Sequence, residues 1–152
     1  KHIFDRQANV NDSFVATLVA HRVEAGVPVD IHGMRFTPVP LLHGKLPILG
    51  YRIEPVRGGA AGPFPLAYCT DVSGIPPESW KMLTGLNTLV LDALRHRKHP
   101  THFTVEQAVR VAGQIEAARA YFVHMAHDLP HEATNAELPE GMSLAHDGLV
   151  LE

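Results

Sequence analysis

Residues 88–127 read TLVLDALRHRKHPTHFTVEQAVRVAGQIEAARAYFVHMAH, and this stretch decides the fold class. It opens with a continuous apolar run, 88–94, which is typical of a strand covered on both faces. Residues 101–118 contain the clearest predicted helix, because Thr104 and Gln107 form a capping box ahead of an apolar stripe. Residues 119–127 predict the next strand. A strand, a helix and a strand in this order indicate an α/β layered fold.

Further strands and helices are predicted on both sides of this stretch. Downstream, residues 143–152 predict a final strand. Upstream, alternating apolar residues predict strands, and short capped or proline-started stretches predict helices. The predicted upstream elements are a helix at 11–26, a hairpin or bulged strand pair at 29–41, strands at 48–56 and 66–72, and a short helix at 76–86.

Length and composition bound the kind of protein. The 152 residues fit a single domain, 1–152, or one half of a larger one. With 13 basic and 16 acidic side chains and no basic stripe, we expect no nucleic-acid surface. No apolar run approaches the ~20 residues of a membrane span, and we expect no signal peptide, because the first residues lack an apolar core segment. The only cysteine is Cys69, so no internal disulfide can form and we expect a cytoplasmic protein.

The chain holds 11 histidines, and three of them fall in the stretch YFVHMAHDLPH, 121–131. On a helix, His124, His127 and His131 would share one face. Pro130 and the preceding Tyr-Phe-Val favour a strand instead, on which positions 124 and 127 point to opposite faces. We therefore expect only His124, at the strand end, to point into a site.

Other polar residues also stand where predicted strands end. Asp71 closes an apolar strand, where its carboxylate either caps a turn or bridges divalent cations. His43 closes another and precedes Gly44, so it is a candidate ligand or a plain loop histidine. His102 directly precedes the capped helix, where an imidazole could transfer a proton or face a phosphate. We interpret His96 and His99, among Arg95, Arg97 and Lys98, as part of a solvated basic loop.

The joint order of these motifs is more specific than any one of them. The stretches TPVPLLHG (37–44), YCTDVSGIPPESW (68–80), LVLDALRHRKHPTHFTVEQAVRVA (89–112) and 121–152 resemble the C-terminal half of the metallo-β-lactamase superfamily, in particular its PhnP-type phosphodiesterase branch. The resemblance covers about residues 35–152. It implies an α/β fold that is the C-terminal half of an αββα sandwich.

The resemblance also implies roles for individual residues. His43, Asp71 and His124 match metal ligands of the family, with Asp71 at the position that bridges two metal ions. His102 matches the active-site histidine that contacts substrate or protonates the leaving group. Three further residues match family positions that either contact and orient the metal ligands or stabilise the fold: His127, Asp128 and Asp147.

One departure from the family limits the analogy. The family's His-x-His-x-Asp-His motif supplies most of the metal ligands, and no His-x-His occurs in these 152 residues. His43, Asp71 and His124 could hold one ion, with water at the open positions, whereas the complete protein would hold two divalent ions, zinc or manganese. We expect the domain to be partial, and to pair with a second copy or with a missing N-terminal half.

The implied activity is metal-dependent hydrolysis of a small phosphodiester, cyclic ones included, through a hydroxide activated by the metal ions. Two alternatives stay open. The chain could be a non-catalytic remnant or interaction domain, because the four-residue motif is missing. It could equally hydrolyse another ester or a lactam, since a fold does not choose a substrate.

Overall fold

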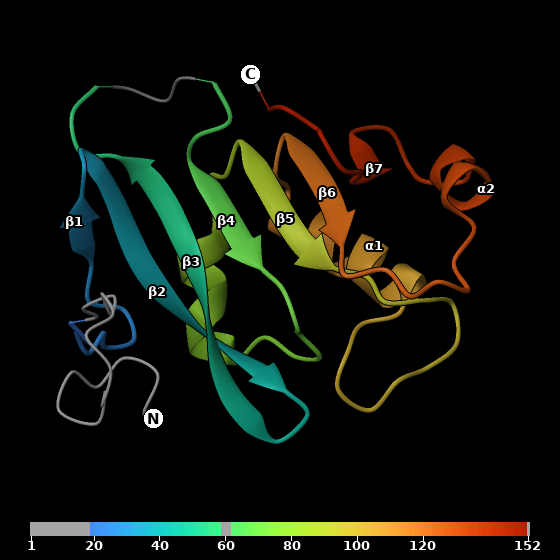
Figure 1. Cartoon of the computed structure of the whole chain (residues 1–152), viewed down its shortest axis with the longest axis horizontal. Helices are drawn as coiled ribbons and strands as arrows, with labels where there is room; N and C mark the ends of the chain where they lie inside the picture. The colour runs from blue at the N-terminus through green and yellow to red at the C-terminus, as the bar shows by residue number, and fades with distance from the viewer. Residues whose placement is uncertain (1–18, 59–61, 152) are drawn as a thin grey trace, which may run out of the picture.

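The computed structural model describes residues 19–58 and 62–151. Seven strands form one mixed sheet in which strand order follows sequence order (Figure 1). The strands are β1 Val29–Ile31, β2 Met34–His43, β3 Leu46–Pro55, β4 Leu66–Cys69, β5 Thr88–Asp92, β6 Arg119–Val123 and β7 Met142–Leu144. The helices are the 3-10 helix η1 Pro77–Leu83, α1 Val105–Ile115 and α2 His131–Ala136.

The first four strands form antiparallel pairs, and the remaining pairs, β4–β5, β5–β6 and β6–β7, are parallel. The parallel pairs are connected through η1, α1 and α2, as parallel strands require a crossover. The α/β class expected from the sequence is confirmed.

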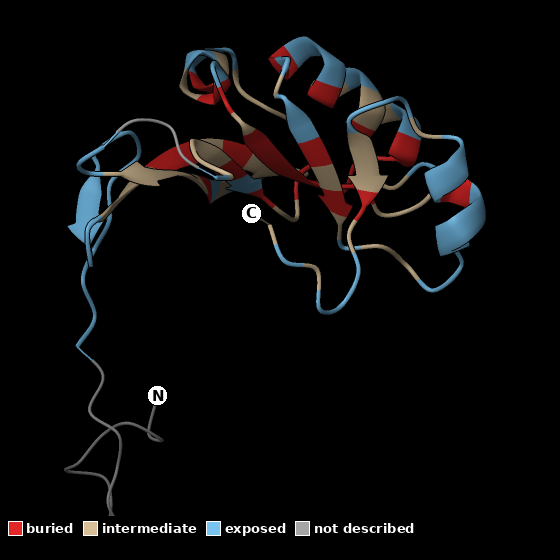
Figure 2. Cartoon of the chain, turned by 90° about the horizontal axis from the view of Figure 1, so that it is seen from above, coloured by how far each residue is buried: buried red, intermediate tan, exposed pale blue. Residues whose placement is uncertain are grey.

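Helices cover one face of this sheet. In Figure 2, η1 and α1 lie on the same side of the strands. Their apolar residues pack onto the residues that β4, β5 and β6 direct to that side, such as Cys69, Leu91 and Phe122, which are fully buried. All five residues of β5 are buried, which explains why its sequence is apolar without alternation.

The opposite face of β1 to β4 is apolar but open. It carries Val29, Ile31, Leu49 and Tyr68, which are exposed. Val29, Ile31 and Tyr68 line a cavity of about 360 Å³ together with Phe36 and others. Half of a two-layer sandwich would leave such an apolar sheet face uncovered.

Helix α1 begins where the sequence predicts a cap. Thr104 Oγ1 accepts a hydrogen bond from the Gln107 backbone N–H at 3.2 Å, and Gln107 Oε1 accepts one from the Thr104 N–H at 3.0 Å. This reciprocal pair satisfies two N–H groups that a helix start leaves without partners. The helix spans Val105–Ile115, inside the stretch 101–118 that was predicted to contain it, and residues 101–103 belong to the loop that enters it.

Three sequence expectations differ from the structure. The predicted helix at 11–26 is wrong over 19–26, which holds no helix and ends in a turn at Gly26, and residues 11–18 lie outside the described part. The strand predicted at 143–152 is limited to β7. The strand predicted at 119–127 ends at Val123, so strand alternation does not apply to His124 and His127.

The antiparallel ladder is tightest at Gly50. A Cβ there would lie 2.7 Å from Leu41 Cδ1, 2.9 Å from the Tyr68 carbonyl oxygen and 3.2 Å from Cys69 Sγ. Real Cβ atoms do not approach a backbone oxygen this closely, so β3 requires glycine for its contact with β4.

We expect Gly50→Ala to lower the free energy of unfolding by about 1–3 kcal/mol, because the added methyl group overpacks the core. Gly113→Ala is the matched control: it lies in α1 with no atom within 4 Å of its Cβ position, and we expect it to stabilise the protein by about 0.5–1 kcal/mol. Urea unfolding of both variants measures the difference. Equal effects would contradict the close approach at Gly50.

Candidate metal centre

Four strands end at the same edge of the sheet. Because β2 and β4 are each antiparallel to β3, and β4, β5 and β6 are parallel, the arrowheads of β2, β4, β5 and β6 point the same way (Figure 1). His43 is the last residue of β2 and Asp92 the last of β5, Asp71 follows β4 by two residues, and His124 directly follows β6. This is the edge at which open α/β sheets bind ligands.

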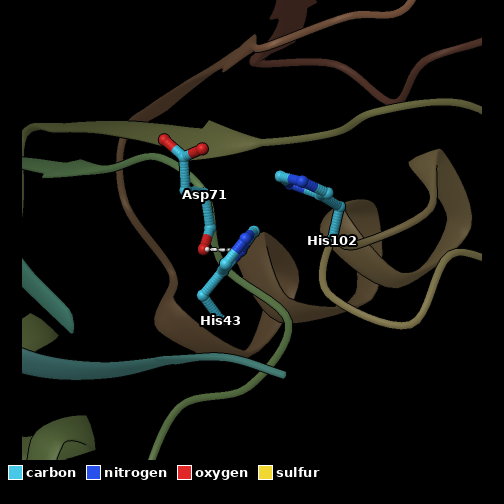
Figure 3. Close-up of side chains that lie close together, drawn as sticks. All are labelled: His43, Asp71 and His102. Carbon is cyan, nitrogen blue, oxygen red and sulfur yellow. Dashed lines mark hydrogen bonds between the residues drawn. The ribbon is translucent and has the colours of Figure 1, made fainter. Parts of the chain in front are cut away.

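His43 is held in one orientation by the backbone of Asp71. Its Nδ1 lies 2.9 Å from the Asp71 carbonyl oxygen (Figure 3). A carbonyl can only accept a hydrogen bond, so Nδ1 carries the proton and donates. In the neutral ring the lone pair is then on Nε2, which is the arrangement of a metal-binding histidine supported by a backbone carbonyl.

Asp71 and His124 meet across the strand ends. The distance from His124 Nε2 to Asp71 Oδ1 is 3.4 Å, and both side chains are about half exposed. Both residues have positive φ, 60° and 63°, which residues other than glycine adopt rarely and at an energetic cost. This conformation turns the chain sharply after each strand, at the two residues whose side chains face each other.

His102 stands at the centre of the cluster. Its ring centroid lies 4.7 Å from those of His43 and His124 and 5.0 Å from that of His99. Figure 3 shows His102 and His43 on the same side of Asp71. The ring is largely buried and enters from the loop between β5 and α1.

Asp92 is the site residue that the sequence analysis missed. It is fully buried, and its carboxylate lies 3.2 and 3.3 Å from His102 Nδ1 and accepts a hydrogen bond from the Phe103 N–H at 3.1 Å. Burial raises the pKa of Asp92 to about 7. The available signal was a carboxylate at the end of an otherwise apolar run, where a charge needs a partner.

His102 and His99 are pushed toward their neutral forms. The pKa of His102 is lowered, first by burial and then by the neighbouring His124 and His43. The pKa of His99 is lowered by desolvation and then by the positive charges of His102 and Arg95. Neutral imidazole is the form that binds a metal ion or accepts a proton.

Within the described part of the chain, two groups of three side chains offer ligand atoms that all lie within 4.8 Å of one another. One is His43, Asp71 and His102, and the other is Asp92, His102 and His124. Mixed imidazole and carboxylate donors suit divalent ions such as zinc and manganese. The geometry therefore gives His102 access to a ligand role in addition to the proton-transfer role expected from the sequence.

The three supporting residues expected from the resemblance lie apart from this cluster. His127 and Asp128 form an exposed turn after β6, and Asp147 is exposed beyond β7. Among the described residues, their side chains make no hydrogen bond. Their supporting role remains a prediction.

His96 and His99 behave differently from each other. His96 is exposed, and its Nε2 lies 3.4 Å from Thr134 Oγ1. His99 is half-buried against His102, with its Nδ1 3.2 Å from Thr101 Oγ1. The solvated-loop interpretation fits His96, whereas His99 borders the site.

Two solved structures are similar to this chain in fold. The chain is 48% identical to a new diphosphatase from the PhnP family, with a TM-score of 0.75, over 85% of this chain and 46% of that one. It is similar in fold to the metallo-β-lactamase fold protein YhfI from Bacillus subtilis, at 14% identity and a TM-score of 0.65, over 84% of this chain and 53% of that one.

A curated relative shares sequence over a small part of its own length. The chain is 33% identical over 129 residues to an octanoyltransferase from Porphyromonas gingivalis, which covers 84% of this chain and 24% of that protein. The chain thus spans a quarter of this relative and about half of the two solved structures.

No helix among the described residues has the length and apolar character needed to cross a membrane.

The family description "Beta-lactamase superfamily domain" matches residues 2–125, which is most of the chain. Together with the metallo-β-lactamase fold of its structural neighbours and the histidines and aspartates gathered at one sheet edge, this match shows that the chain belongs to the β-lactamase superfamily, in which it is similar to a member of the PhnP family.

Proposed function

We propose that this chain forms part of a metal-dependent hydrolase that cleaves small phosphodiesters. The observation that carries the proposal is the convergence of His43, Asp71, His102 and His124, which come from four separate segments, at one edge of the sheet. The diphosphatase with 48% identity supports phosphorus–oxygen bond cleavage over other hydrolytic reactions.

His43, Asp71 and His124 would hold a divalent ion. His43 offers Nε2, because Nδ1 is bonded to the Asp71 carbonyl, and Asp71 offers a carboxylate that can bridge. Zinc and manganese both suit this donor set. When bound, the ion supplies Lewis acidity that activates water near neutral pH and offsets charge on the phosphate. A second ion would need ligands beyond these residues.

His102 would donate the proton that hydrolysis requires. Neutral His102 carries its proton on Nδ1, toward Asp92, so Nε2 first accepts a proton from the attacking water. The water oxygen bonds to phosphorus, the phosphorus–oxygen bond to the leaving group breaks, and the leaving oxygen takes that proton from Nε2. Asp92 accepts from His102 Nδ1 and so fixes the ring with Nε2 toward the site. In this role Asp92 is a positioning residue, since it acts through His102.

A second candidate substrate class is the diphosphate bond, favoured by the diphosphatase that is 48% identical to this chain.

A panel of substrates tests the substrate class directly. We expect the protein expressed from its complete gene to hydrolyse bis-p-nitrophenyl phosphate or a diphosphate diester, to lose this activity with a chelator, and to leave a β-lactam and a thioester intact. Cleavage of the lactam or thioester alone would overturn the proposal, as would full activity in the chelator. A protein without metal and without turnover would instead be the non-catalytic domain.

We expect Asp71→Asn to lower the bound metal measured by mass spectrometry to less than about half, because the variant loses the negative charge that compensates the ion. Asp30→Asn is the control, since Asp30 is exposed in β1 and lies outside the cluster. Equal metal content in the wild type and Asp71→Asn would remove Asp71 from the ligand set.

We expect His102→Gln to retain metal and to slow turnover by roughly 10²–10⁴-fold, the range for loss of a general acid. The loss should be smaller for a p-nitrophenyl ester than for an alkyl ester, because p-nitrophenolate leaves without needing a proton. If metal content fell with activity, His102 would be a ligand.

We expect Asp92→Asn to lower kcat with little change in KM, and to shift the pH–rate profile of the complete protein, since an amide can hydrogen-bond Nδ1 in either sense but does not stabilise a charged ring. A purely structural role would lower stability and leave the pH–rate profile of the folded fraction unchanged. Steady-state kinetics as a function of pH, with circular dichroism to check folding, separates the two.

A further inference from the structure

We propose that Arg95, Arg97 and His99 form a subsite for a second phosphate, so that the preferred substrates are diphosphate diesters, in which two phosphates share a bridging oxygen. The inference rests on the proposed phosphoester hydrolase function and deepens it. The phosphate that is attacked would lie at the metal ligands, and the second phosphate of the same substrate would bind in this subsite.

The loop that carries these side chains is fixed at its base. The Leu94 N–H donates to the Phe103 carbonyl at 3.0 Å, and the Val105 N–H donates to the Arg95 carbonyl at 3.1 Å. Arg95 Nε also donates to the Arg97 carbonyl at 3.3 Å. The two ends of the loop therefore lie side by side, and Arg95 is tied to the backbone of Arg97.

The same loop packs against the candidate metal centre. The His99 ring lies 5.0 Å from that of His102, so His99 is the next side chain outward from the proposed proton donor. On the other side, Thr101 Cγ2 would be 2.9 Å from a Cβ placed on Gly44, the residue that follows His43. The glycine thus allows the loop to close onto the turn between β2 and β3.

Positive charge gathers in this loop without a partner. Residues 93–103 contain Arg95, Arg97, Lys98 and three histidines, and no carboxylate. In the described part of the chain, none of these three cations forms an ion pair, whereas Arg35, Arg52 and Arg110 each pair with an acid. The whole chain has a net charge of −3, so this loop is a positively charged segment in a chain that is negative overall.

The two arginines are joined to the part of the loop that borders the site. Arg95 Nε donates to the carbonyl of Arg97, two residues before His99, and the His99 ring borders that of His102. An anion beside His99 would be attracted by both arginines, and guanidinium groups bind phosphate oxygens through paired N–H donors. A phosphate next to the attacked one would meet these groups first.

The test is Arg97→Gln in the protein expressed from its complete gene. Arg97 is exposed, so the substitution leaves the core intact. Arg119→Gln is the matched control, because Arg119 is exposed at the start of β6 and hence at the opposite edge of the sheet. Steady-state kinetics compare P1,P2-diadenosine diphosphate, which has two phosphates, with bis-p-nitrophenyl phosphate, which has one.

We expect Arg97→Gln to raise KM for the diphosphate diester by about tenfold, the effect of losing one charged phosphate contact, with kcat nearly unchanged. KM for bis-p-nitrophenyl phosphate should change by less than about twofold, and Arg119→Gln should affect neither substrate. Equal effects of Arg97→Gln on both substrates, or no effect on either, would overturn the subsite.

Direct binding separates this inference from the proposed function. Methylenediphosphonate is an uncleavable diphosphate analogue and methylphosphonate its single-anion counterpart. Measured by calorimetry, Arg97→Gln should weaken the affinity for methylenediphosphonate by about tenfold and leave the affinity for methylphosphonate unchanged. If the wild type hydrolysed no phosphoester, the proposed function would fail, and this binding result alone would decide the subsite: unchanged methylenediphosphonate affinity overturns it.

Discussion

The hydrogen bond from His43 Nδ1 to the Asp71 carbonyl is the contact on which the rest of the site depends. It joins the end of β2 to the turn after β4, two segments 28 residues apart, and it leaves His43 Nε2 as the nitrogen with a free lone pair. The bond forms because β2 and β4 are both antiparallel to β3, which brings their carboxyl ends to one edge. A ligand orientation is thus fixed by backbone geometry.

The site combines strain with electrostatic compensation. Positive φ at Asp71 and His124 costs conformational free energy, and a buried carboxylate at Asp92 costs desolvation. Both costs fall on residues that meet within one cluster of imidazoles, and His102 gives Asp92 its partner. The same cluster borders an unpaired basic loop, so carboxylates sit inside the site and cations around it. That distribution suits a bound cation with an anionic substrate at its rim.

The sequence predicted the part of this arrangement that local pattern controls. The apolar run at 88–94, the Thr104–Gln107 cap and the polar residues at strand ends all reappear in the structure, because burial and capping act over a few residues. The contacts of Asp92 and of His99 with His102 could not be predicted, because they depend on how the loop between β5 and α1 closes. The helix predicted at 11–26 was wrong over 19–26, where Val23 lines the cavity on the open face of the sheet.

The most direct test of the central claim is the anomalous diffraction of a zinc- or manganese-soaked crystal of the complete protein. The account predicts a metal peak roughly 2.0–2.2 Å from both His43 Nε2 and an Asp71 carboxylate oxygen, with His43 Nδ1 still bonded to the Asp71 carbonyl. A peak bound through His43 Nδ1, or metal located only away from His43 and Asp71, would contradict it.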